Sequence, residues 1–113
     1  TTYADIEQFK SHFSNNSAIQ VRTIPAISLD AIMEQEHINS LHLLKIDCEG
    51  AEYEILMALP ESYFAKIEKI AMETHITQAY KTEDMAEFLL SKGYQVKYVT
   101  RQKTRTGHVW AWK

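Results

Sequence analysis

The sequence predicts an α/β domain with a mostly parallel sheet that ends in an antiparallel β-hairpin. Two apolar segments, LHLLKI (41–46) and IEKIAMETH (67–75), are typical of buried strands, and a helical pattern follows each of them. Strands that alternate with helices form parallel sheets with right-handed crossovers. The segments YQVKYVT (94–100) and HVWAW (108–112) are joined only by RQKTRTG. That connection is too short for a parallel crossover, so this pair is predicted to be antiparallel.

The segments before the first strand are less regular. Apolar residues at helical spacing predict a helix within YADIEQFKSHF (3–13). The stretch AIQVRTIPAISL (18–29) is rich in β-branched residues, but Pro25 restricts it to an edge or irregular strand. Asp30 is expected to cap a short helix that ends near His37.

The helices that follow the two apolar strands have clear boundaries. The segment AEYEILMAL (51–59) predicts a helix that stops at Pro60, because proline cannot continue a helix. Thr82 is the expected cap of the second helix, and Lys92 and Gly93 close it with a cation and a residue that tolerates positive φ.

Length and composition restrict the class of protein. The 113 residues suffice for one small domain, and a net charge of −3 gives no general attraction to nucleic acid. No apolar run reaches the ~20 residues that span a bilayer, so no membrane span is predicted. Cys48 is the only cysteine, which favours a reducing, cytoplasmic location. Because the sequence begins with Thr1, we expect it to be part of a larger protein.

Acidic residues concentrate where the first apolar strand ends. Asp47 follows that strand directly, and Glu73 and His75 end the next strand at the same phase. Ligands of open parallel sheets bind outside the carboxyl ends of the strands. We therefore expect these side chains, together with Glu49, to face a ligand.

A simpler interpretation applies to part of the same turn. Glu52 and Glu54 fall at a helix start, where carboxylates complement the helix dipole by about 0.3–1 kcal/mol each. Gly50 is expected to allow close packing of the helix on the strand. Cys48 is expected to be a small buried residue.

These residues carry a resemblance to a known family. LLKIDCEGAEYEIL (43–56), preceded by TIPAISLDAIMEQ (23–35) and followed by IAMETH (70–75) and LLSKGYQV (89–96), resembles the second half of FkbM-family methyltransferases. The hallmark of that family is L-K-[IL]-D-x-E-G-x-E. The resemblance implies a Rossmann-like class I methyltransferase fold and dependence on S-adenosylmethionine. It also implies methylation of a hydroxyl group, on a sugar or a polyketide-type product.

The chain departs from the family in its glycines. Family members hold the cofactor with a glycine-rich turn, whereas the glycines here stand at positions 50, 93 and 107 and form no G-x-G loop. The resemblance thus implies that residues 1–113 are a single partial domain, the C-terminal half without the cofactor-binding half, and inactive alone. Asp47 and Gly50 would face the cofactor from the retained side. The alternative is a non-catalytic, methyltransferase-like module for binding or assembly.

Methyl transfer to a hydroxyl requires removal of the hydroxyl proton. Asp47, Glu49, Glu73 and His75 are the candidate bases, and His75 suits this role because its ordinary pKa lies near neutrality. A hydrogen-bonded histidine at a strand end is an equal alternative. Asp47 and Glu73 could instead hold a Mg²⁺ ion that acidifies the hydroxyl. The expected partner is a small-molecule or carbohydrate acceptor.

The missing strands would leave an open sheet edge beside residues 41–47. Because unpaired apolar edges recruit partner chains, we expect self-association through this edge.

Overall fold

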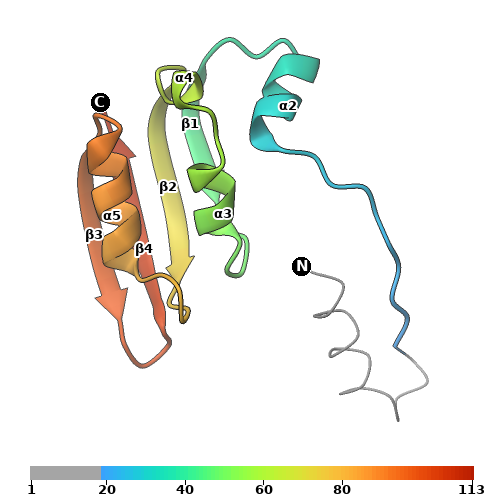
Figure 1. Ribbon diagram of the computed structural model, residues 1–113. Coiled ribbons are helices and arrows are strands. Elements are labelled where there is room, and N and C mark those ends of the chain that lie inside the picture. The colour runs from blue at the N-terminus through green and yellow to red at the C-terminus, as the bar shows by residue number, and fades with distance from the viewer. Residues whose placement is uncertain (1–18) are drawn as a thin grey trace.

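The structure, a computed structural model, describes residues 19–113, so the helix predicted over residues 3–13 lies outside the described part of the chain. The described elements (Figure 1) are, in order, α2 (Leu29–Gln35), β1 (Leu41–Ile46), α3 (Glu52–Met57), α4 (Glu61–Phe64), β2 (Ile67–His75), α5 (Thr82–Ser91), β3 (Gln95–Arg101) and β4 (Thr106–Trp112). The predicted alternation of strands and helices is present. The short helix α4 was not predicted.

The strands form one mixed sheet in the order β1-β2-β4-β3. β1 and β2 are parallel, whereas β4 runs antiparallel to both of its neighbours, β2 and β3. The prediction of an antiparallel terminal hairpin is confirmed. The prediction of a mostly parallel sheet needs correction, because only one of the described pairings is parallel. β2 and β3 run in the same direction, but they are not neighbours. β4 lies between them and pairs antiparallel with each.

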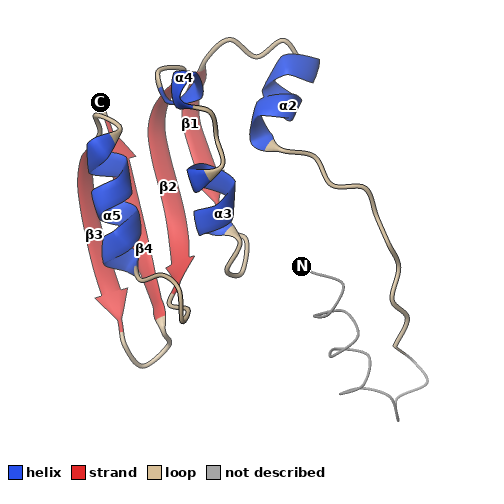
Figure 2. Ribbon diagram, viewed as in Figure 1, coloured by secondary structure: helices blue, strands red, loops and turns tan. Residues whose placement is uncertain are grey.

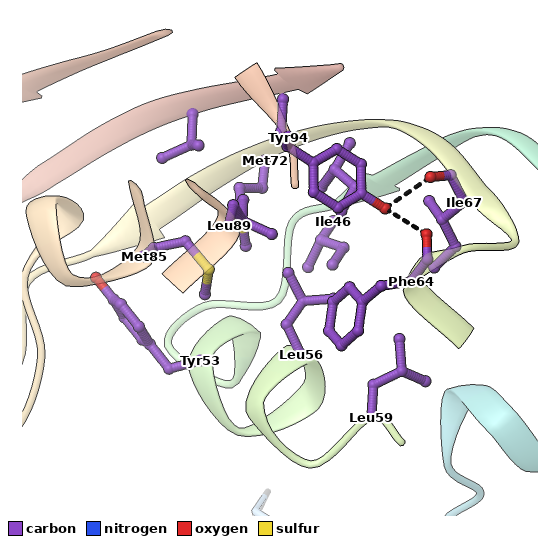
Figure 3. Close-up of a cluster of buried hydrophobic side chains, with 13 residues drawn as sticks. Ile46, Tyr53, Leu56, Leu59, Phe64, Ile67, Met72, Met85, Leu89 and Tyr94 are labelled. Atoms are coloured by element: carbon purple, nitrogen blue, oxygen red, sulfur yellow. Dashed lines mark hydrogen bonds between the residues drawn. The ribbon is translucent and has the colours of Figure 1, made fainter. Parts of the chain in front are cut away.

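One face of the sheet carries the helices and the core. Ile46, Met72 and Val109 are paired across β1, β2 and β4, so their side chains share a face. Helices α3, α4 and α5 lie on that face (Figure 2). The buried cluster between the helices and the sheet (Figure 3) consists of Ile46, Tyr53, Leu56, Leu59, Phe64, Ile67, Ile70, Met72, Met85, Leu89, Tyr94, Val109 and Ala111. Burial of each large apolar side chain contributes about 1.5–3 kcal/mol.

Tyr94 ties two parts of this core together. Its hydroxyl donates to the carbonyl oxygens of Phe64 (2.9 Å) and Ile67 (2.6 Å), as the dashed lines in Figure 3 show. The chain entering β3 is thereby attached to the chain that enters β2. Burial raises the pKa of Tyr94 to about 12.

No described helix covers the opposite face of the sheet. On this face Leu43 is 54% exposed and Trp110 is 42% exposed. The interpretation of residues 41–46 as a buried strand is therefore wrong for this face of β1 in the described part of the chain.

The helix starts differ from the predicted caps. The hydroxyl of Ser28, not Asp30, caps α2 by accepting from the backbone nitrogen of Ala31 (3.3 Å). α5 begins one residue after Lys81, whose backbone nitrogen donates to Asp84 (2.7 Å). Residues 19–28, which include Pro25, form no strand.

Thr82 instead serves to join α5 to the sheet. Its hydroxyl lies 2.9 Å from the hydroxyl of Thr74 in β2, and both side chains are fully buried. Gly107 of β4, the partner of Thr74 across the sheet, lies against this pair. A Cβ at position 107 would overlap Thr82 Oγ1 and would lie 2.8 Å from Thr74 Oγ1. The absence of a side chain at Gly107 thus allows α5 to approach the sheet next to His75.

Candidate active site

The turn after β1 has an unusual backbone. Glu49 has a φ of +44° and Gly50 a φ of +108°, so two successive residues are left-handed. A left-handed conformation costs a non-glycine residue such as Glu49 about 1–2 kcal/mol. A Cβ at Gly50 would meet nothing within 4 Å. Gly50 is therefore required for its φ, and the expectation that it allows close helix–strand packing is wrong. The side chain of Glu49 extends into solvent.

Glu52 is the buried centre of this turn. It is the first residue of α3, its side chain is fully buried, and it accepts hydrogen bonds from two segments of the chain. Its Oε2 accepts from the backbone nitrogen of Gly50 (2.8 Å), and its Oε1 accepts from the backbone nitrogen of His75 (2.6 Å). The two hydrogen bonds of its carboxylate thus connect the turn after β1 to the carboxyl end of β2.

His75 lies between two carboxylates. Its Nδ1 is 3.1 Å from Oε1 of Glu52, and its Nε2 is 3.4 Å from Oε2 of Glu49. The side chain of His75 is 20% exposed and that of Glu49 is 86% exposed. The imidazole is therefore held from the buried side and is accessible from the side of Glu49.

Asp47 and Glu73 lie around a separate hollow of about 190 Å³. Ala71 of β2 is paired with Lys45 of β1 and with Trp110 of β4. The small side chain of Ala71 therefore lies between two long side chains, which leaves space above it. The lining residues are Lys45, Ile46, Asp47, Ala71, Met72, Glu73, His108 and Trp110. The ring of His108 stacks on Trp110 with centroids 5.8 Å apart. The hollow thus combines two carboxylates, one ammonium group and an aromatic surface.

The structure sorts the predicted site residues into two groups. Gly50 and His75 contact Glu52, and Glu49 contacts His75. Asp47 and Glu73 instead line the hollow. In the described chain, residues 19–113, no cluster of three or more histidine, cysteine or carboxylate side chains has the arrangement of a metal site. The Mg²⁺ ion on Asp47 and Glu73 therefore stays a prediction.

The role of Glu52 differs from the one that its position at a helix start predicts. Its hydrogen bonds go to Gly50 and His75, outside α3, and not to the start of the helix. The sequence places an acid two residues after a glycine turn and a histidine at the end of the next strand, but no local rule links two residues that are 23 positions apart. Cys48 was also misjudged, because it is exposed.

A second, larger cavity of about 450 Å³ lies beside the open edge of β1. Its walls come from α2, the segment before α2, β1 and α3, and they are mainly apolar: Ile27, Leu29, Ile32, Leu44, Ile46, Ile55, Ala58 and Leu59. Cys48 and Glu54 also line it.

Charged side chains at the carboxyl ends of the parallel strands β1 and β2 lie where open α/β sheets bind their ligands. The sequence pattern of the family described as "Methyltransferase FkbM domain" matches residues 1–96. The chain belongs to this family, and the resemblance found in the sequence is confirmed.

Two solved structures are also similar to the chain. It is similar to the "METTL16 MTase domain (crystal form 2)", with 14% identity and a TM-score of 0.49, over 98% of this chain and 45% of that chain. It is also similar to the "delta-N METTL16 MTase domain", with 14% identity and a TM-score of 0.46, over 98% of this chain and 56% of that chain. The chain thus spans about half the length of these structures. No curated protein matches it. Within residues 19–113, no helix has the length and apolar character needed to cross a membrane.

Proposed function

We propose that the protein uses S-adenosylmethionine to methylate a hydroxyl group of a small-molecule or carbohydrate acceptor. The family assignment supports methyl transfer as the general activity. The observation that supports the specific chemistry is the arrangement of Glu49, His75 and Glu52, which offers an imidazole nitrogen near solvent and carboxylates beside both ring nitrogens.

The cofactor supplies an electrophilic methyl group, and the acceptor must lose its hydroxyl proton in the same reaction. In the proposed mechanism this proton passes to Nε2 of His75, and the carboxylates of Glu52 and Glu49 stabilise the resulting imidazolium. Asp47 and Glu73 can accept hydrogen bonds from further hydroxyl groups of the acceptor, since both line the adjoining hollow.

We also propose that residues 1–113 are the C-terminal half of the catalytic domain. Two observations support this: the sequence has no G-x-G loop to hold the cofactor, and it spans about half of the methyltransferase domains that it matches. Asp47 and Gly50 would contribute to the cofactor site from this half. The same lack of a glycine-rich loop favours the second candidate function, a non-catalytic binding module.

Transfer of labelled methyl groups distinguishes these functions. The complete protein is incubated with labelled S-adenosylmethionine and a panel of sugars and polyketide-type alcohols, and label in the acceptor is measured. We expect transfer, and we expect His75→Ala to lower it by about 10²-fold or more, the scale of losing a general base. The matched control is Glu54→Gln, an exposed acid in the same helix as Glu52. Full activity of His75→Ala contradicts the mechanism, and absence of transfer to every acceptor favours the binding module.

A further inference from the structure

The donors around Glu52 determine which nitrogen of His75 carries a proton. The backbone nitrogens of Gly50 and His75 can only donate, so both oxygens of Glu52 act as acceptors. Nδ1 of His75 faces Oε1, one of these same acceptor oxygens, at 3.1 Å. Nε2 faces the carboxylate of Glu49 at 3.4 Å, but that side chain is 86% exposed, whereas Glu52 is fully buried. The shorter and buried contact favours the hydrogen on Nδ1. In the neutral imidazole the lone pair is then on Nε2.

The burial of the two side chains separates their roles. Glu52 is fully buried, so its carboxylate contacts the protein and has no surface to offer a substrate. Nε2 of His75 lies on the opposite side of the ring, toward the solvent-exposed Glu49 at 3.4 Å. Glu52 can therefore influence a reaction at Nε2 only through the ring that it holds.

The hydrogen bonds also fix the orientation of the ring. Oε1 accepts from both the backbone nitrogen and Nδ1 of His75, which restricts rotation of the imidazole relative to its own backbone. Oε2 is occupied by Gly50, so the carboxylate itself is fixed by the turn after β1. The position of Nε2 thus depends on a connection between two strand ends.

We propose that Glu52 is the positioning residue of His75: its buried carboxylate keeps the proton on Nδ1, so that the lone pair which accepts the hydroxyl proton is on Nε2, beside the exposed carboxylate of Glu49. The catalytic part of this statement rests on the proposed function, whereas the tautomer and the ring orientation do not. A helix-capping role for Glu52 would leave the tautomer of His75 unaffected.

The first test is the tautomer of His75 in the isotope-labelled protein. A long-range nitrogen–proton correlation spectrum at mildly alkaline pH, where imidazoles are neutral, distinguishes a proton on Nδ1 from one on Nε2. We expect the Nδ1–H form in the wild type and in Glu54→Gln. In Glu52→Gln, the amide has one acceptor oxygen for three donors, so we expect a mixture or the Nε2–H form. An Nε2–H tautomer in the wild type overturns the proposal, whether or not the variant folds.

The second test is kinetic and uses the complete protein. We expect Glu52→Gln to lower kcat by about 10²-fold or more while KM changes little, because Glu52 does not touch the acceptor. Glu52→Asp retains the carboxylate and should restore part of the kcat and part of the Nδ1–H signal. If Glu52→Gln changes the tautomer but leaves kcat unchanged while His75→Ala is inactive, the positioning role is overturned and the proposed function remains. If His75→Ala itself is fully active, the proposed function fails.

Discussion

Replacement of Gly107 by alanine tests the junction of α5 with the sheet. The new Cβ would overlap Thr82 Oγ1 and would lie 2.8 Å from both Thr82 Cγ2 and Thr74 Oγ1. These atoms belong to two fully buried side chains that are hydrogen-bonded to each other at 2.9 Å. Neither threonine can move without losing that bond or displacing α5.

The expected cost is the sum of two terms. Overpacking of a close-packed core costs about 1–3 kcal/mol. Separation of the two hydroxyl groups costs about 1 kcal/mol more. We expect Gly107→Ala to lower the free energy of unfolding by about 2–4 kcal/mol, which for a domain of this size lowers Tm by ~10 °C or more.

The assay is equilibrium urea unfolding of four variants: Gly107→Ala, Gly93→Ala, Thr82→Ala and the double variant of Gly107→Ala with Thr82→Ala. Gly93→Ala is the control, because Gly93 has a φ of +92° but nothing within 4 Å of its Cβ position. It should show only backbone strain, about 1–2 kcal/mol. Thr82→Ala removes both Thr82 atoms that the new Cβ would meet, so the double variant with Gly107→Ala should be more stable than additivity predicts. Additive losses in the double variant, or a Gly107→Ala protein as stable as the wild type, would refute the reasoning.

Four further outcomes are expected. Asp47→Asn removes a carboxylate proposed to contact the acceptor and the cofactor, so it should lower turnover by about 10- to 10²-fold without changing Tm, whereas Glu54→Gln should change neither. An unfolded Asp47→Asn protein with fully active residual material would make Asp47 structural. If Asp47 and Glu73 hold a divalent ion, chelation should abolish turnover and added Mg²⁺ should restore it. Full activity in excess chelator would contradict the metal site and would favour direct transfer of the hydroxyl proton to a side chain. Burial raises the pKa of Tyr94 to about 12 from the ordinary 10.0, so the folded state holds this proton more tightly than the unfolded state. Stability from this group is present below ~pH 10 and is lost as the pH rises toward ~12, and urea titrations should show a shallower alkaline loss in Tyr94→Phe. Sedimentation should detect self-association through β1, and a monomer at high concentration contradicts it.

The order of strands and helices was predictable because local patterns determine it. The apolar segments 41–46 and 67–75 form β1 and β2. The connection between β3 and β4 is short, so these strands pair as an antiparallel hairpin. The position of β4 between β2 and β3 was not predictable from those patterns. It depends on long-range packing, such as the fit of Gly107 against Thr74 and Thr82.

The candidate site shows the same division. The acids at the strand ends could be identified because a buried strand ends in charge at Asp47 and at Glu73. The role of Glu52 could not, because an acid at a helix start satisfies the local rule whether it is exposed or buried. Only the tertiary structure places its carboxylate against His75, which is 23 residues away in the sequence.

The placement of β4 also has a consequence during synthesis of the protein. β2 can pair with β1 once both have left the ribosome, but its other edge stays bare while α5 and β3 are translated, because Thr106–Trp112 is the strand that fills it. β3 has no partner during that interval either. A nascent chain that lacks Thr106–Trp112 therefore leaves one edge of β2 and both edges of β3 unpaired, the kind of surface that aggregates or engages chaperones. The surroundings of His75 are completed by the strand that the ribosome makes after all the other strands of the sheet.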